Sequence, residues 1–210
     1  KCRYSSSFFA YKSVGVALTI VGSSISLTKA EKTMLSDVQS VVKDKLYETA
    51  RSLSYDEAEQ IDSFEEPVKL FKRWQALPGD VPHHRNIKAH QFEQHILPSF
   101  YILDVIPEHF EDNTTGDVDF QFRLFGTANT DNYGKEGTAK RLSDMSHDGS
   151  GAGFDITKHA YHTASAQFLL CEYHKNNKHV KTGSLVIMPL SDDNGAIVRM
   201  FGCAIWTTPE

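Results

Sequence analysis

The chain has 210 residues, 40% of them hydrophobic and 23% charged, with a formal net charge of −5. That composition is typical of a globular protein, and the length allows one well-buried core with an appended segment. The acidic balance argues against a nucleic-acid partner, because phosphate binding needs a concentrated basic surface. Three widely spaced cysteines, none in a Cys-x-x-Cys pair, predict free thiols and a cytoplasmic location.

An uncharged segment lies near the start of the chain, from Ser13 to Leu27. It is shorter than the roughly 18–20 apolar residues that a membrane-spanning helix needs. It is therefore a strand or buried segment, a membrane anchor formed by residues 4–27, or a signal sequence whose basic end is Lys1 and Arg3. Its length favours the first interpretation.

An amphipathic helix is predicted over residues 28–53. It begins with Thr28-Lys-Ala-Glu31, which has the form of a capping box, and its apolar residues recur at three- and four-residue steps. Such a helix packs on its own domain or forms the interface of a homodimer. The repeat covers only about three heptads, the lower limit for a coiled coil. A homodimer is our expectation for the assembled protein.

Three further helices are expected before the sheet. Ser54 and Glu57 repeat the capping pattern and start a short acidic helix that ends near Ile61. A second helix carries Val68–Trp74 and stops at a Pro-Gly turn. A third is predicted over Ile87–Ile96, capped by Asn86.

The remainder predicts strands at Phe100–Ile106, Val118–Phe125, Val180–Pro189 and Ala196–Thr207. The last two are joined by a hairpin at Ser191–Gly195.

Helical segments separate the second and third of these strands. Short helices and turns are expected over Thr127–Leu142, followed by a flexible loop at Asp148–Gly153. A long helix is then predicted from Asp155, its cap, to about His174.

A lone acid and a lone base occupy the first two strands. Asp104 lies among the apolar residues of one, and Arg123 lies in the alternating run Phe120–Phe125 of the next. They predict a cross-strand ion pair in an antiparallel sheet. The alternative is that Arg123 faces a pocket and binds a carboxylate with both guanidinium nitrogens.

An ordered set of short motifs resembles a bacterial PAS-like sensor family. The chain carries Phe71-Lys-Arg-Trp74, Val81-Pro-His-His-Arg85, Leu97-Pro98 leading to Leu103-Asp104, Arg123-Leu-Phe-Gly-Thr127, Tyr133-Gly134 and Met188-Pro-Leu-Ser-Asp192. It departs from the family at Thr138-Ala139, where the pattern has Thr-Gly, and in a Pro-to-Arg spacing that is one residue longer.

The resemblance covers about residues 66–207. It implies a PAS-like α+β domain over residues 66–210, with a five-stranded antiparallel sheet and flanking helices. Residues 1–65 would be an N-terminal extension. It also implies a sensory role in signal transduction and a small, largely apolar ligand, but names neither the ligand nor a downstream partner. The alternative is a ligand-free module for dimerisation or protein interaction.

The candidate ligand-binding residues are the aromatic and apolar side chains that could line the concave side of such a sheet, together with one cation. They are Phe120, Phe122, Arg123, Leu124, Tyr133, Phe168, Met188 and Phe201. A filled core is the alternative, because in a PAS domain the packed core narrowly encloses any cavity.

Enzymatic chemistry finds little support in the sequence. There is no Gly-x-Ser-x-Gly nucleophile motif. His159 and His162 could face the same way on a helix, but they lack a clear third metal ligand and a catalytic acid. We therefore expect a protein that is not an enzyme, and the sequence identifies no cofactor.

Overall fold

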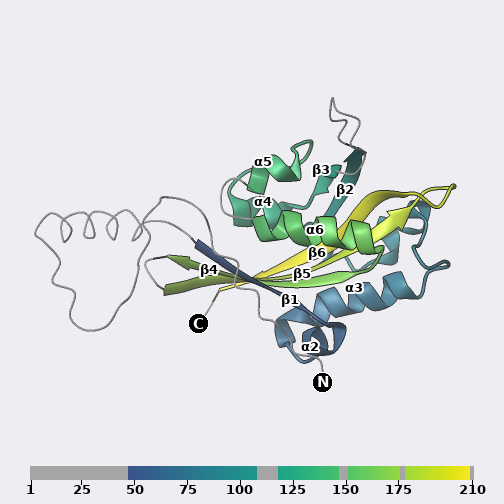
Figure 1. The fold of residues 1–210 in the computed structure, drawn as a ribbon. Coiled ribbons are helices and arrows are strands. Elements are labelled where there is room, and N and C mark those ends of the chain that lie inside the picture. The colour runs from purple at the N-terminus through teal and green to yellow at the C-terminus, as the bar shows by residue number, and fades with distance from the viewer. Residues whose placement is uncertain (1–46, 108–117, 147–150, 176–177, 209–210) are drawn as a thin grey trace, which may run out of the picture. The chain divides into compact units, whose positions relative to one another are not determined.

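The computed structural model describes residues 47–107, 118–146, 151–175 and 178–208. These residues form one six-stranded antiparallel sheet with helices on both faces (Figure 1). The predicted α+β class and antiparallel sheet are confirmed, with six strands in place of the expected five.

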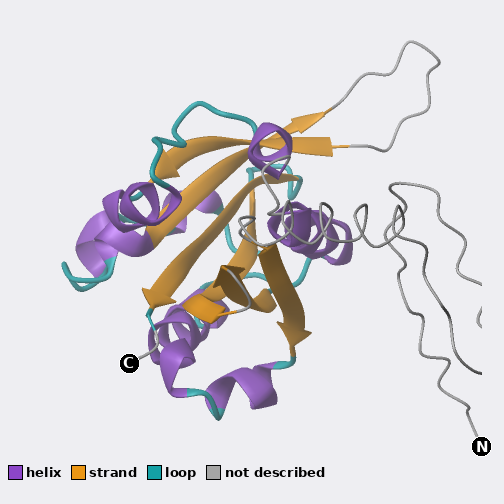
Figure 2. Ribbon diagram, turned by 90° about the vertical axis from the view of Figure 1, so that its left-hand side faces the viewer, coloured by secondary structure: helices purple, strands orange, loops and turns teal. Residues whose placement is uncertain are grey.

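The sheet has the strand order β1-β4-β5-β6-β2-β3, and every neighbouring pair is antiparallel. Its strands are β1 (Tyr47–Leu53), β2 (Phe100–Pro107), β3 (Val118–Phe125), β4 (Gln167–Lys175), β5 (Lys178–Ser191) and β6 (Ile197–Thr207). Figure 2 shows the twist of the sheet between the two helical layers.

One face of the sheet is covered by α2 (Tyr55–Glu59) and α3 (Glu65–Gln75), and we call it the α3 face. The opposite face carries α4 (Thr127–Tyr133), α5 (Leu142–Ser146) and α6 (Gly151–Thr163), and we call it the α6 face. Short 3-10 turns lie at Asp62–Phe64, His84–Asn86, Ala89–Gln91 and Leu97–Ser99.

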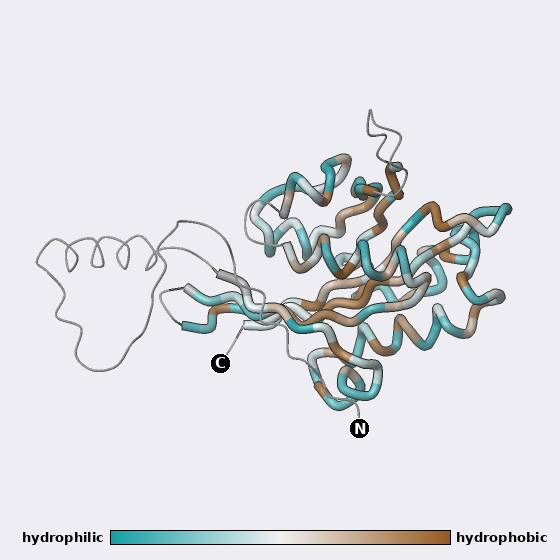
Figure 3. The backbone as a smooth tube through the Cα atoms, viewed as in Figure 1, coloured by the Kyte–Doolittle hydropathy of each residue, from teal (hydrophilic) through white to brown (hydrophobic). Residues whose placement is uncertain are grey.

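Because successive side chains of a strand point to opposite faces, the sheet carries two hydrophobic cores. Phe168, Met188 and Phe201 belong to the core of the α3 face. Their neighbours Leu169, Ile187 and Met200 belong to the core of the α6 face. The hydrophobic stretches accordingly concentrate in the middle strands, between helices with hydrophilic outer surfaces (Figure 3).

The predicted helix over residues 28–53 is wrong at its C-terminal end, and residues 28–46 lie outside the described part of the chain. Residues 47–53 form β1, which pairs with β4 so that Leu53 lies opposite Phe168. Leu53 is buried in the core of the α3 face. Pairing with β4 therefore outweighs the helical periodicity of the sequence. The uncharged segment Ser13–Leu27 also lies outside the described residues.

The long helix predicted from Asp155 to His174 is wrong at both ends. It begins at Gly151, so that Asp155 is not its cap and Gly151–Gly153 are not part of a loop, and it ends at Thr163. Ala164 adopts a left-handed backbone (φ 51°), and the N–H of Ser165 donates to the carbonyl of Ala160 at 3.2 Å, which closes the helix end. The apolar run that follows is strand β4. A short continuous apolar run suits a buried strand as well as a helix, and here cross-strand pairing decides.

The predicted helix over Ile87–Ile96 is also wrong, because this segment contains only the 3-10 turn Ala89–Gln91 and irregular backbone. The four strands expected from the sequence are confirmed in β2, β3, β5 and β6. The capping box of Ser54 and Glu57 is confirmed as well. The Ser54 N–H donates to Glu57 Oε2 at 2.8 Å, and the Glu57 N–H donates to Ser54 Oγ at 3.2 Å. Among the described residues, no helix has the length and apolar character needed to cross a membrane.

Candidate functional site

A small apolar cavity lies between the sheet and the helices of the α6 face. Its volume is about 50 Å³. Tyr101, Phe122 and Leu169 contribute its sheet wall, and Ile156 of α6 and Leu142 at the start of α5 contribute its helical wall. The cavity therefore sits at the boundary between the rigid sheet and helices that cover it.

Few polar groups border this cavity, and the structure engages them with other partners. The amide nitrogen of buried Asn129 donates to the carbonyls of Ser99 and Phe100, at 3.1 and 3.2 Å. Its amide oxygen accepts from Trp206 Nε1 at 3.0 Å. The Tyr101 hydroxyl donates to the carbonyl of Val186 at 2.8 Å, and burial raises the pKa of Tyr101. A ligand here would meet mainly apolar surface.

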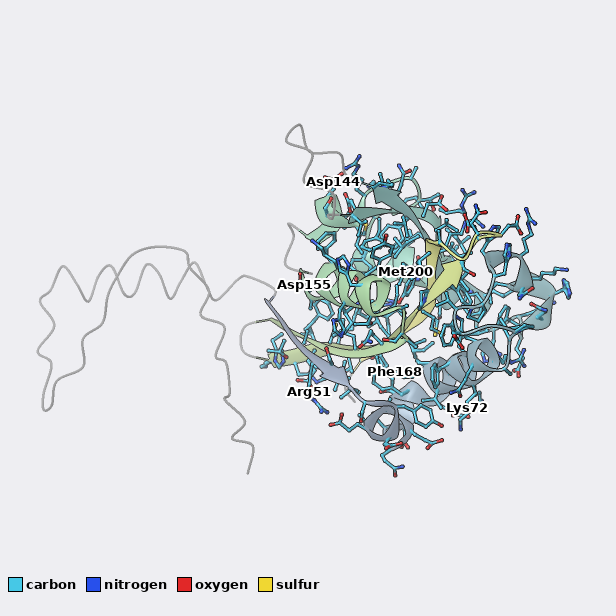
Figure 4. The ribbon with its side chains drawn as sticks, turned by 45° about the vertical axis from the view of Figure 1, so that its right-hand side comes forward. Arg51, Lys72, Asp144, Asp155, Phe168 and Met200 are labelled. Carbon is cyan, nitrogen blue, oxygen red and sulfur yellow. The ribbon has the colours of Figure 1, made fainter. Side chains whose placement is uncertain are left out.

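The candidate ligand-binding residues do not gather on one side of the sheet. Phe122 and Tyr133 line the cavity, and Phe120 packs nearby in the same core against Phe154 and Tyr161. Three further candidates, Phe168, Met188 and Phe201, belong to the core of the α3 face. Figure 4 shows Phe168 on the α3 side and Met200 on the α6 side. A single pocket lined by all of them is therefore excluded.

Leu124 does not share a face with Phe120 and Phe122, as the alternation of the sequence predicted. The pairing of β2 with β3 shifts between Ile102 and Leu103, so that Arg123 is an extra residue in a β-bulge. After the bulge Leu124 is 42% exposed, and Phe125 takes the buried position instead. Leu124 is therefore removed from the cavity lining.

The predicted pair between Asp104 and Arg123 is confirmed. Arg123 donates through Nε to Asp104 Oδ1 and approaches Oδ2 through Nη2, both at 2.8 Å. The sequence did not reveal a second base: Arg199 of β6 also donates through Nε to Asp104 Oδ1, at 3.0 Å. Arg123 is therefore a structural partner and not a cavity residue.

Two histidines extend this network of Asp104, Arg123 and Arg199: His84, in the 3-10 turn His84–Asn86, and His83, just before that turn. Arg199 Nη1 lies 3.0 Å from His84 Nδ1, and the ring of His83 packs against that of His84 with centroids 4.5 Å apart. His83 Nε2 lies 3.0 Å from Asp193 Oδ1 in the β5–β6 turn. The network thus ties the segment that follows α3 to strands β2, β3 and β6.

The charges of the network shift the pKa of two groups. Burial alone would raise the pKa of Asp104, but the hydrogen bonds and charges of Arg123 and Arg199 outweigh it and hold that pKa below its usual value. Burial lowers the pKa of His84, and the charge of Arg199 lowers it further. Asp104 is thereby ionised and His84 neutral at pH 7.

The histidine pair weighed as a metal site lies on α6, where both side chains are exposed. Among the residues that the structure describes, no group of three or more His, Cys, Asp or Glu side chains could hold a metal ion. Cys171 and Cys203 are buried free thiols.

Asn129, Trp206 and Gln167 border or support the cavity, and the sequence did not single them out. One signal pointed towards Asn129. Gly126 precedes it in the Gly-Thr motif, and a Cβ at that glycine would lie only 2.1 Å from the carbonyl oxygen of Pro98. The glycine permits the close backbone approach that places Asn129 against the carbonyls of Ser99 and Phe100.

Comparison of the chain with protein-family models, with curated proteins and with solved structures found no match.

Proposed function

We propose that residues 66–210 form a PAS-like sensory domain that binds a small apolar molecule in the cavity between the sheet and α6. The apolar lining of the cavity carries the proposal, since small-molecule sites are lined mainly by apolar side chains with a few polar groups. The element order adds support. Strands β2 and β3, short helices, a longer helix and the β5–β6 hairpin follow one another in the order that the sequence predicted, with β4 as an additional strand between α6 and β5.

The size of the cavity limits the ligand. A single water needs roughly 10–15 Å³ of such space, whereas an apolar cavity of about 150 Å³ accommodates benzene. At about 50 Å³ the cavity lies between these limits. The ligand is therefore smaller than benzene, unless Leu142 and Ile156 move with their helices and enlarge the space.

The position of the cavity suggests how binding would be transmitted. Its sheet wall is anchored by the ladders of β5 with β4 and β6, and its helical wall belongs to α5 and α6. A ligand that binds one packing of α6 on the sheet more tightly than another would shift the population towards that packing. Signal transduction through α6 follows from this differential affinity.

The test fills the cavity from its sheet wall. Ala204 lines the cavity and is buried. Thermal unfolding would be measured with a panel of probes from xenon to benzene, in wild type and in Ala204→Leu. We expect stabilisation of wild type by at least one probe and its loss in Ala204→Leu. Leu169→Ala enlarges the same cavity and should accept larger probes.

A matched control changes the next residue on the other face. Cys203→Ala alters the core of the α3 face and should leave the probe response unchanged. Circular dichroism would verify that each variant is folded. Equal stabilisation of wild type and Ala204→Leu by every probe, or no stabilisation of either, would refute ligand binding in this cavity.

A ligand-free module for dimerisation or protein interaction is the second candidate. The observation in its favour is the completeness of packing, since Phe120, Met188 and Phe201 have no exposed surface. The many aromatic side chains of the core would then contribute only to the stability of the fold. Under this alternative no probe would stabilise the protein, and shortening the chain before β1 would convert a homodimer into monomers.

A further inference from the structure

A second, larger hollow lies on the α3 face, where strand β1 ends. The register places Leu53, the last residue of β1, opposite Phe168 of β4, so Gln167 and the residues before it extend past the end of β1. The space beyond Leu53 is a groove of about 410 Å³. This volume is within the range of about 300–1,000 Å³ that small-molecule sites usually have.

Four aromatic rings line the groove: Tyr55, Phe71, Trp74 and Phe168. The ring centroids of Tyr55 and Phe71 are 5.3 Å apart, and so are those of Phe71 and Phe168. The Trp74 ring stacks on Phe71 at 6.1 Å, and its Nε1 donates to the carbonyl of Pro189 at 3.0 Å. The aromatic wall is thus held by contacts within itself and by the sheet.

The charges around the groove are negative. Asp80 is the one charged residue in the lining. Helices α3 and α6 end beside the groove, at Gln75 and Thr163, and the C-terminal end of a helix carries partial negative charge. The faces of aromatic rings are also negative. All three features favour a cation.

Two basic residues of α3 already have partners of their own. Lys72 binds Glu59 at 2.7 Å, and Arg73 donates to the carbonyl of Gln91. The ammonium group of Lys72 also lies 5.8 Å from the centre of the Tyr55 ring. One ring of the aromatic wall therefore already interacts with an ammonium group of the chain itself.

We propose that this groove binds an organic ammonium ion with an aromatic or aliphatic body, whose apolar part packs on Phe71, Trp74 and Phe168 and whose charge meets Asp80. The site is separate from the cavity on the α6 face and does not depend on it. Its recognition rests on cation–π attraction, apolar burial and one carboxylate, with hydroxyl groups of Ser54 and Ser165 at the border.

The test compares two probes of nearly equal shape that differ in charge, 2-phenylethylammonium and 2-phenylethanol. Binding to the full chain is followed by the NMR shift of the Trp74 indole N–H. Cation–π and carboxylate contributions together predict about tenfold tighter binding of the ammonium probe. Asp80→Asn should weaken ammonium binding about threefold and leave the alcohol unchanged.

Asp131→Asn is the matched control, because Asp131 is also exposed but lies in α4 on the other face. It should bind both probes as wild type does. Phe71→Leu keeps an apolar surface and should reduce the preference for the ammonium probe. Equal affinity for the two probes, equal effects of Asp80→Asn and Asp131→Asn, or shifts confined to residues of the α6 face would each overturn the proposal. Ala204→Leu should leave groove binding intact, which separates this outcome from that of the cavity test.

Discussion

Asp104 binds two arginines, which both donate to the same carboxylate oxygen, Oδ1. Arg123 and Arg199 come from the strands on either side of β2. One acid therefore joins three strands at a place where the register shifts. Its side chain is 30% exposed, so water screens part of the attraction.

Replacing Asp104 with Asn should lower the free energy of unfolding by about 1–2 kcal/mol at pH 7, because both arginines lose their ionised partner. The folded-state pKa of Asp104 is lowered, so its contribution is fully present above the unfolded pKa of about 4. The contribution is lost as the pH falls through the lower folded pKa. Urea unfolding of both proteins at pH 7 and pH 3 would measure this.

The control is Asp131→Asn, which removes an exposed carboxylate without these partners. It should change stability by less than about 0.5 kcal/mol at either pH. A difference between wild type and Asp104→Asn that stays constant from pH 7 to pH 3 would contradict the role given to the carboxylate charge.

At the scale of elements, the segment after α4 contains an alanine whose backbone conformation usually belongs to glycine. The resemblance has glycine where this chain has Ala139, and Ala139 adopts a left-handed conformation with φ 66°. Its N–H donates to the Phe122 carbonyl at 2.7 Å, and its own carbonyl accepts from Gln121 at 2.9 Å. The conformation is therefore held by β3 against the preference of alanine.

Ala139→Gly should increase the free energy of unfolding by about 0.5–1 kcal/mol, because glycine adopts positive φ without steric cost. Ala160→Gly is the opposing control. Ala160 is fully buried inside α6, where glycine should destabilise by about 1 kcal/mol or more. Thermal and urea unfolding would compare the two. Destabilisation by Ala139→Gly would show that the left-handed backbone carries no strain.

The elements that the sequence predicted correctly are those with local signals. Alternating side chains predict β2 and β3, the Asp-Asn-Gly turn predicts the β5–β6 hairpin, and the Ser54–Glu57 capping box predicts α2. The failures depend on distant partners. Strand β4 has an apolar run that suits a helix until β1 and β5 pair with it. The exposure of Leu124 follows from a bulge that only the pairing with β2 creates.

For the whole molecule, the feature that sequence could not supply is the division of the core. Seven aromatic or apolar residues were expected around one pocket. The sheet separates six of them into two groups of three, and the seventh, Leu124, is exposed. The alternation of side chains along a strand tells which residues of that one strand lie on opposite faces of the sheet. It does not say which face of β3 is continuous with which face of β5 or β6, because that depends on register across the sheet.

Strand β1 gives a prediction at the same scale. Deleting residues 1–46 should leave the cooperative unfolding of the sheet intact. Deleting residues 1–53 should lower the free energy of unfolding by about 3 kcal/mol, because it removes the ladder with β4 and the buried side chain of Leu53. Urea unfolding and light scattering of both truncated chains would measure stability and mass.

The two deletions also bear on assembly. If the segment before β1 forms the dimer interface, both truncated chains will be monomeric. A dimer that persists after deletion of residues 1–46 places the interface elsewhere. Equal stability of the two truncated chains would contradict the structural part that β1 takes in the sheet.

The cavity and the groove meet at the beginning of β4, where Leu169 lines the first, Phe168 lines the second and Gln167 borders both. Substitution can therefore tune the two sites separately, one residue at a time. A one-residue slip of β4 against β1 and β5 would instead exchange the two walls and turn Phe168 towards the cavity, so the register of β4 determines both sites together.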